Sequence, residues 1–521
     1  MPHAPRPSAP HRPGFVIAAV AATLLLSSLG QTIVATALPT IVSDLGGADY
    51  LTWVVIAYLL SATIVAPIYG KLGDLFGRKI VLQVAVLVFL AGSALAAAAS
   101  SMTYLILARA VQGLGGGGLM VVAMTVVADV IPPRQRGQVQ GLLGAVFGLS
   151  TVAGPLLGGL LVDRFSWHAI FLLNLPLGLA ALAVITFALR PAQARQRRPI
   201  DYAGFGLLGM TLAAFIGVTS LGGKVLPWTS LPLLGLFALS ILSLIGLVVV
   251  ERRAAEPVLP PGLFRINTFV IVNGMGLLTG MAMFGCTTFV PLFLQTVKGE
   301  SPTASGLQLI PMMGGLVVSS TLAGLVMSRT GRYKILALAG TVSLTAGLLL
   351  LTRIGVDMPT WQVVTAMLLV GVGLGPINSV GVSAIQNAVD RSIVGVATAS
   401  SMMFRQIGGS LGVSVLGAVF SAALAARLPG GSGQGGFGPA ALSSLPDALR
   451  QDSLRAFSEA LHPVFLVAAA GAVMTIVLAL LLREKTLVPA LRQEPEAEIA
   501  AELAATAAAV GGPAPPSTDR T

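Results

Sequence analysis

The sequence predicts an all-α protein that crosses a membrane many times. Of its 521 residues, 55% are hydrophobic and only 10% are charged, and the mean hydropathy is +0.88. A soluble protein of this size needs more charged groups than that on its surface. The apolar residues also gather in runs of about 20, the length that an α-helix needs to cross the hydrocarbon core of a bilayer.

Fourteen such runs follow one another, which predicts fourteen membrane helices. They lie at 15 to 41, 52 to 69, 80 to 99, 104 to 128, 139 to 161, 168 to 189, 203 to 221, 231 to 250, 269 to 294, 304 to 327, 335 to 352, 361 to 383, 396 to 424 and 463 to 482. The first run follows a basic segment and could instead be a signal peptide. Its length favours a helix that is kept, because a signal core is shorter.

Most of the 31 Lys and Arg residues fall in one set of alternate connections. Positive charge marks the cytoplasmic side, so we expect both termini to be cytoplasmic. The net charge of +11 then reflects topology, and we expect no nucleic-acid partner because the basic residues form no single stripe. Four tryptophans begin even-numbered runs at the expected outer face, as in an interfacial belt: Trp53, Trp167, Trp228 and Trp361.

The connection between the second and third runs is rich in glycine and charge, Gly70-Lys-Leu-Gly-Asp-Leu-Phe-Gly-Arg-Lys79, and predicts a tight hairpin at the membrane face. A weaker copy spans 324 to 334, where Ser328 stands in the place of Asp74. The chain is therefore internally duplicated, and we expect the first copy to be the more sensitive to mutation.

The stretch from Gly70 to Lys79 resembles the loop signature between helices 2 and 3 of the major facilitator superfamily. Three further stretches match its drug-exporter branch in the same order, at 31 to 39, 109 to 113 and 150 to 159. They resemble the first-, fourth- and fifth-helix signatures of fourteen-helix drug:proton antiporters of the multidrug or antiseptic resistance type. The resemblance implies a major facilitator fold, with two six-helix bundles and two inserted helices.

The expected domains follow from this match. Residues 1–14 and 483–521 form disordered cytoplasmic tails, 15–189 the first six-helix bundle, 190–268 the inserted helices 7 and 8 with their loops, and 269–482 the second bundle. The second bundle includes a long outer loop at 425–462. Its first part is glycine-rich, and its second part, 449 to 457, is either an amphipathic helix on the membrane surface or a linker.

A cytoplasmic latch is expected around the first glycine-rich connection. Asp74 can reach a neighbouring helix end, and Arg78 can pair with an acid, which the resemblance implies to be Asp129. Such a network would hold the cytoplasmic side closed in the outward-open state. Alternatively, these charges only set the topology. The expected latch residues are Gly70, Gly73, Asp74, Gly77, Arg78, Lys79 and Asp129.

Arg109 lies inside the span at 104 to 128, where a cation is costly unless it faces protein or water. We expect it to point into a cavity and to share a helix face with Gln112 and Gly113. The resemblance implies that it couples proton movement to the conformational cycle. A purely structural cation bonded to carbonyl groups is the alternative.

The span at 139 to 161 carries small residues that permit close helix approach and a proline that permits a kink. It is a candidate pivot, although ordinary packing of small residues is the alternative. The expected hinge residues are Gly154, Pro155, Gly158 and Gly159.

The chain departs from the drug:proton antiporters at Gly30, where they commonly have an acid, and no Asp or Glu lies at mid-membrane depth. No proton carrier can be named, and neutral, zwitterionic or amphiphilic substrates are as plausible as cations. The expected substrate-binding residues are Gln31, Asn273, Gln308, Asn378, Phe404 and Arg405, with Phe284, Met312 and Met313 as an adaptable apolar wall. Each could instead face lipid or the core.

Other classes of protein lack support. The sequence has no GxxxxGK[ST] phosphate loop, its four histidines show no metal-ligand spacing, and its single Cys286 lies in an apolar run. We expect no enzyme activity, cofactor or metal. The leading interpretation is a monomeric, multi-pass exporter of the bacterial cytoplasmic membrane that moves amphipathic drugs or hydrophobic small molecules by proton antiport with alternating access. A proton-independent lipid or metabolite facilitator and a transport-dead scaffold are the alternatives.

Overall fold

The computed structural model describes residues 13–46, 51–189, 201–222, 226–300, 302–427 and 447–484, and nearly all of them are helical. The elements of the first half are α1 (Pro13–Thr32), α2 (Val34–Leu45), α3 (Leu51–Phe76), α4 (Arg78–Ala97), α5 (Met102–Val130), α6 (Pro133–Arg164), α7 (His168–Leu172) and α8 (Asn174–Ala188). A helix pair follows, α9 (Tyr202–Leu221) and α10 (Leu231–Glu251). The second half comprises η2 (Pro261–Arg265), α11 (Asn267–Thr296), α12 (Pro302–Leu307), α13 (Ile310–Thr330), α14 (Lys334–Leu351), α15 (Thr360–Ala388), η3 (Arg391–Ile393), α16 (Val394–Ala425) and α18 (Asp447–Leu481).

Within the described residues, 13 helices are long and apolar enough to cross a membrane. The remaining predicted span falls on α6, a 32-residue helix in which the apolar stretch that qualifies, Val139–Ser150, is shorter. The prediction of an all-α polytopic membrane protein is thereby confirmed.

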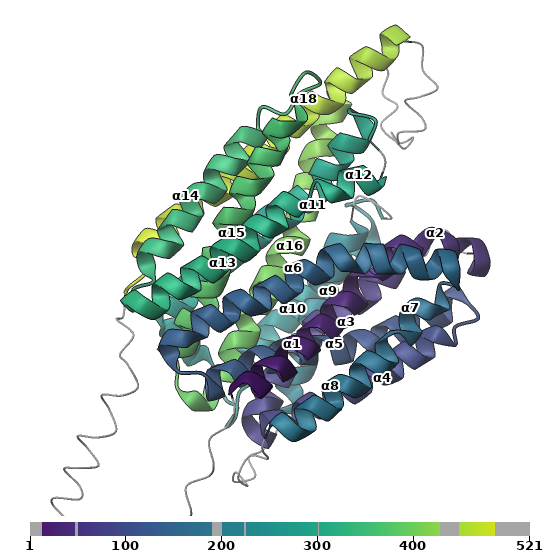
Figure 1. The fold of residues 1–521 in the computed structure, drawn as a ribbon. Coiled ribbons are helices and arrows are strands. Elements are labelled where there is room, and N and C mark those ends of the chain that lie inside the picture. Colours follow the sequence, from purple (N-terminus) through teal and green to yellow (C-terminus); the bar gives the residue numbers. More distant parts are fainter. Residues whose placement is uncertain are drawn as a thin grey trace, which may run out of the picture.

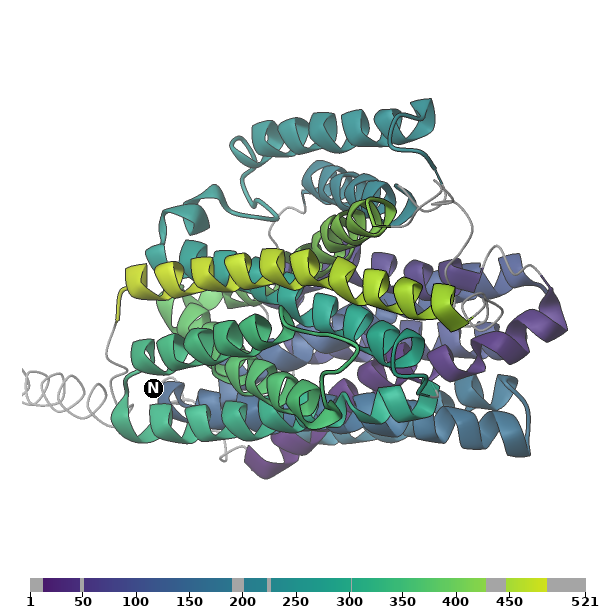
Figure 2. The same cartoon turned by 90° about the horizontal axis from the view of Figure 1, so that it is seen from above.

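The helices form two bundles with a pair beside them (Figure 1). Helices α1 to α8 pack among themselves, chiefly around α5, and α11 to α18 do the same around α15 and α16. The α9–α10 pair packs mostly on itself, and α9 also contacts α3 and α16 (Figure 2). A salt bridge of 2.8 Å between Lys71 Nζ and Glu256 Oε2 ties the segment after α10 to α3.

Three predicted spans are broken in the structure. The first predicted span consists of α1 and α2, which separate at Ile33. The sixth consists of α7 and α8, and the tenth consists of α12 and α13. The last span begins earlier than predicted, because α18 runs without interruption from Asp447. Phe457 is buried there and packs edge-on against Phe420, with ring centroids 5.0 Å apart.

Residues 449 to 457 are therefore helical and not a linker, but they form the first part of α18 and not a separate surface helix. The glycine-rich segment at 430 to 436 lies outside the described residues. So do residues 1–12 and 485–521, which make up most of the two predicted tails.

The predicted glycine-rich hairpin is shorter than expected. Helix α3 continues to Phe76 and α4 begins at Arg78, so that Gly77 alone makes the connection, with a φ of 90° that favours glycine. Gly70 serves close approach instead, because a Cβ on it would lie 2.7 Å from the carbonyl oxygen of Gly395 in α16. Gly73 meets only Arg78 Cγ, at an ordinary 3.7 Å. We call this end of the molecule the Gly77 end.

One of the four tryptophans does not belong to an interfacial belt. Trp228 and Trp361 are 48% and 64% exposed, as expected for side chains at a membrane interface. Trp167 is 1% exposed, donates a hydrogen bond of 2.8 Å to Asp44 Oδ2 and stacks on His168. It is part of the core at the end of the first bundle that lies opposite the Gly77 end.

Candidate functional site

Asp74 joins the two bundles at the Gly77 end. Its Oδ1 accepts a hydrogen bond from the backbone N–H of Gly395 at 3.1 Å, and its Oδ2 accepts one from Val396 at 3.2 Å. These N–H groups belong to the first turn of α16, where backbone donors lack helical partners and the helix dipole favours a negative charge. A carboxylate of the first bundle thus caps a helix of the second.

Arg78 forms an ion pair with Asp74. Its Nη2 lies 3.2 Å from Asp74 Oδ1 and its Nε lies 2.9 Å from Asp129 Oδ2, while Nη1 donates to the carbonyl oxygen of Thr125. The guanidinium therefore links the end of α5 to the α3–α16 contact. Lys79 lies outside this cluster, because its Nζ donates to the carbonyl oxygen of Thr186 in α8 at 2.7 Å.

A second contact between the bundles is centred on Arg136, in the first turn of α6. Its Nη1 donates to Asn387 Oδ1 of α15 at 2.6 Å, and its Nη2 and Nε bond the carbonyl oxygens of Ala128 and Ile131 at 2.6 and 3.1 Å. From the same turn of α15, Gln386 Nε2 donates to the carbonyl oxygen of Met124 at 3.2 Å. We call the Asp74 and Arg136 contacts the two clamps.

Sequence reasoning treated Arg136 only as a charge that sets topology. A cation in the first turn of a helix is electrostatically unfavourable, and this signal could have identified it as a residue that needs partners. The weaker glycine-rich copy is not equivalent to the first. There, Ser328 Oγ donates to the carbonyl oxygen of Leu325 within its own helix.

Close packing of α6 against α13 continues the interface from the clamps towards the middle of the molecule. A Cβ on Gly141 would lie 2.6 Å from Thr321 Cα, and one on Gly148 would lie 2.8 Å from Val317 Cγ2. In Figure 1 the bundles diverge towards the opposite end, where α2 and α12 lie. The described bundle-to-bundle contacts therefore hold the Gly77 end closed.

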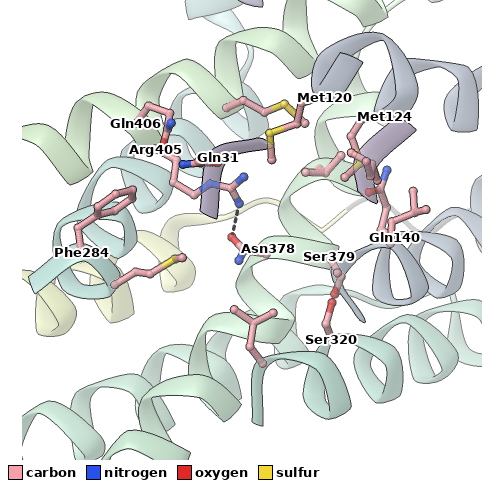
Figure 3. Close-up of a pocket in the computed structure, with 17 residues that line it drawn as sticks. Gln31, Met120, Met124, Gln140, Phe284, Ser320, Asn378, Ser379, Arg405 and Gln406 are labelled. Atoms are coloured by element: carbon pink, nitrogen blue, oxygen red, sulfur yellow. Dashed lines mark hydrogen bonds between the residues drawn. The ribbon is translucent and has the colours of Figure 1, made fainter. Parts of the chain in front are cut away.

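A cavity of about 130 Å³ lies between the bundles, beyond this closed end (Figure 3). Helices α1, α5 and α6 line it from one side, and α11, α13, α15 and α16 from the other. Its walls are formed by Leu24, Gln31, Met120, Met124, Gln140, Leu143, Gly144, Met283, Phe284, Leu316, Ser320, Asn378, Ser379, Val382, Met402, Arg405 and Gln406.

Three of the six expected substrate-binding residues line this central cavity: Gln31, Asn378 and Arg405. Two smaller cavities adjoin it. One of about 30 Å³ shares Asn378 and Arg405, and one of about 40 Å³ shares Gln31 and Gln406. Each of the three expected polar residues thus lines the central cavity and one of the smaller ones, and Phe284 contributes to the apolar wall.

The other three expected residues lie elsewhere. Asn273 is buried and donates to the carbonyl oxygen of Phe269 in its own helix at 2.7 Å. Gln308 lies between α12 and α13 and donates to both carboxylate oxygens of Glu300, at 2.6 and 2.7 Å. Phe404 packs into the cluster that α9 and α10 form with α16.

Met312 and Met313 belong to the core of the second bundle, and other methionines take their place in the cavity: Met120, Met124, Met283 and Met402. Sequence reasoning also missed four polar residues of the wall, Gln140, Ser320, Ser379 and Gln406. Each is a polar side chain in an apolar span, which was the available signal. The sequence did not show which side of each helix faces the other bundle.

Arg109 does not point into the cavity, which corrects the expectation. It is 0% exposed, and its Nε and Nη1 donate to the carbonyl oxygens of Val54 and Gly30 at 3.2 and 3.0 Å. The guanidinium carbon lies 4.4 Å from the ring centre of Tyr58, and Tyr58 lines the 40 Å³ cavity. Arg109 therefore stands behind the wall, and its contacts match the structural alternative, a cation bonded to carbonyl groups.

The neighbours of Arg109 are tightly packed. Gln112 accepts a hydrogen bond from its guanidinium and donates one of 2.7 Å to Ser93 Oγ. A Cβ on Gly113 would lie 2.1 Å from Ser61 Oγ, so this glycine serves the close crossing of α5 and α3. At Gly30, the position of the missing acid, a Cβ would lie 2.6 Å from the ring of Phe89.

The predicted hinge lies in α6, which is one unbroken helix from Pro133 to Arg164. A Cβ on Gly154 would lie 2.2 Å from Thr32 Oγ1, next to the break between α1 and α2, so close approach explains this glycine. Gly158 is buried, whereas a Cβ on Gly159 would meet open space. The side chain of Pro155 lies outside the described residues, and the hinge stays a prediction.

A family model described as Major Facilitator Superfamily matches residues 20–413. An uncharacterized MFS-type transporter of Mycobacterium tuberculosis is 40% identical over 482 residues, which cover 91% of this chain and 70% of the relative. The multidrug transporter protein MdtP of Bacillus subtilis is 39% identical over 399 residues, covering 77% and 74%. Among solved structures, the MFS proton:xylose symporter XylE aligns with a TM-score of 0.60 at 14% identity, over 91% of this chain and 97% of XylE, which shows the shared fold.

Proposed function

Since the chain belongs to the Major Facilitator Superfamily of membrane transporters, we propose that it exports amphipathic drugs or hydrophobic small molecules. The observation that carries this proposal is the central cavity between the two bundles, whose wall combines aliphatic, aromatic and thioether side chains with seven polar ones. Methionine-rich walls adapt to ligands of different shape, as a multidrug site requires. The substrate class of MdtP, a multidrug transporter by name, is consistent with it.

The two clamps suggest how access to the cavity changes sides. Both join one bundle to the other at the Gly77 end. We assign this end and both termini to the cytoplasm, because most Lys and Arg residues fall in one set of alternate connections. Breaking them would let the bundles rock apart there while the opposite end closes. In this scheme the described conformation has a closed cytoplasmic side, and the protein resides in the bacterial cytoplasmic membrane as a monomer.

Proton antiport is the drive that we propose for this cycle. Asp74 is a buried carboxylate whose two oxygens accept the α16 hydrogen bonds, and its charge pairs with Arg78. A proton on Asp74 would weaken all of these bonds together, because each is strongest with an ionised acceptor. Proton binding would thus open the cytoplasmic clamp.

A facilitator without proton coupling is the second candidate. None of the 20 Asp and Glu residues is among the described residues that line the cavity, and Gly30 stands where related antiporters commonly have an acid. Substrate and proton would therefore not compete for one carboxylate in the cavity.

The test is efflux of a fluorescent amphiphile from cells that express the protein, with and without a protonophore. Efflux that the protonophore stops supports proton antiport. A chain carrying Arg78→Ala, which weakens the clamp, is expressed in parallel as a control. Efflux that persists when the proton gradient has collapsed would establish the facilitator instead. A broad panel of amphiphiles with no efflux at all would overturn the transport proposal.

A further inference from the structure

The charge of the central cavity comes from one side chain. Among the 17 described residues that line it, Arg405 alone is charged. Its Nη1 donates to Asn378 Oδ1 at 2.9 Å, and no carboxylate is among the residues that line the cavity with it. The cavity therefore carries a net positive charge.

The two arginines within the spans are solvated in different ways. Arg109 is fully enclosed, and backbone carbonyl oxygens and an aromatic ring surround its guanidinium. Arg405 instead faces an open cavity and gives one of its five N–H donors to a neutral amide. An ionised group at membrane depth is costly without a counter-charge, so Arg405 favours a ligand that supplies a negative charge.

The surroundings of Arg405 fit the head of such a ligand. In Figure 3 the side chains of Gln31, Gln406 and Asn378 lie around the guanidinium, and they come from α1, α16 and α15. Their amide groups can donate further hydrogen bonds to an anion. Met124 lies at the other end of the cavity, so an apolar body attached to the anionic head would extend over thioether and aliphatic side chains.

We propose that the molecules exported through this cavity are amphipathic organic anions, whose carboxylate or sulfonate group pairs with Arg405 while the apolar body lies along the methionine wall. This inference rests on the proposed export function and narrows its substrate class. It predicts discrimination by charge, because an amphipathic cation would meet a guanidinium that has no counter-charge among the described residues lining the cavity.

The test uses three amphiphiles that share one fluorescent apolar body and end in a carboxylate, a neutral amide or a quaternary ammonium group. Uptake into inverted membrane vesicles gives transport, and the ligand-induced rise in unfolding temperature of the detergent-purified protein gives binding separately. Arg405→Gln is the test variant. Arg427→Gln is the matched control, because Arg427 lies two residues beyond the end of the helix that carries Arg405 and pairs with Glu459 at 3.4 Å.

For the parent protein we expect the carboxylate to be preferred over the ammonium compound. Arg405→Gln should lower the preference for the carboxylate over the amide by about 10- to 100-fold, the value of a charge-assisted hydrogen bond. Arg427→Gln should leave it unchanged. A preference for the cation, or an anion preference that survives in Arg405→Gln, would overturn this inference while transport stands. Binding of the carboxylate without transport of any compound would instead overturn the export function alone.

Discussion

Replacing Asp74 by asparagine removes the charge at the centre of the first clamp and leaves the side chain the same size. Asparagine keeps one acceptor oxygen, so one of the two hydrogen bonds from Gly395 and Val396 is lost. The capping bond is worth about 1 kcal/mol, and the attraction between the buried carboxylate and the α16 dipole adds about 1 to 2 kcal/mol. Arg78 keeps its ion pair with Asp129, so we expect no further loss of stability of the closed state from Arg78.

The closed state should therefore lose about 2 to 3 kcal/mol, which lowers the ratio of closed to open molecules about 30- to 150-fold. Spin labels on Phe76→Cys and Ser392→Cys can report this ratio through the distance distribution across the clamp. Both side chains are exposed, one at the end of α3 and the other just before α16. A Cys286→Ala background removes the native thiol, which is buried.

Asp390→Asn is the matched control, since Asp390 is an exposed carboxylate four residues before α16. It removes the same charge without touching the described clamp, and we expect it to leave the distance distribution unchanged. An unchanged distribution in Asp74→Asn would refute the role of Asp74 as a clamp. An equal shift in Asp390→Asn would show that general electrostatics, and not the α16 cap, holds the end closed.

Two further predictions concern Arg136 and Arg109 of the first bundle. Arg136→Gln should lower the ratio of closed to open molecules at the same end about tenfold, because the charge-assisted bond to Asn387 is lost. The spin-label distances report this ratio. Asn387→Ala should add little on that background, and fully additive effects would contradict a shared contact. Arg109→Met should lower the free energy of unfolding by about 2 to 4 kcal/mol, since the carbonyl oxygens that it serves lose their donor. An Arg109→Met protein that has the parent's thermal stability but does not transport would contradict the structural role and support a role of Arg109 in proton coupling.

The class of fold follows from the sequence because the thickness of the bilayer sets the length of each apolar run. A helix must stay apolar for the full thickness of the hydrocarbon core, so hydropathy alone located the spans. It could not locate the break at Ile33 or the early start of α18 at Asp447, because a helix can end within an apolar run or continue into a polar one. The four motifs identified the chain's family through residue types at fixed spacings.

The direction in which each polar side chain faces depends on how the helices pack against one another. Phe404 and Arg405 are neighbours in one helix, yet Phe404 packs against the α9–α10 pair and Arg405 faces the cavity. The spans are apolar on every side, since lipid and the bundle core are both apolar, and the sequence therefore carries little amphipathic signal for rotation about the helix axis. Packing within the first bundle placed Arg109 behind the wall, and the packing of the two bundles on each other placed Arg136 in a clamp and Arg405 in the central cavity.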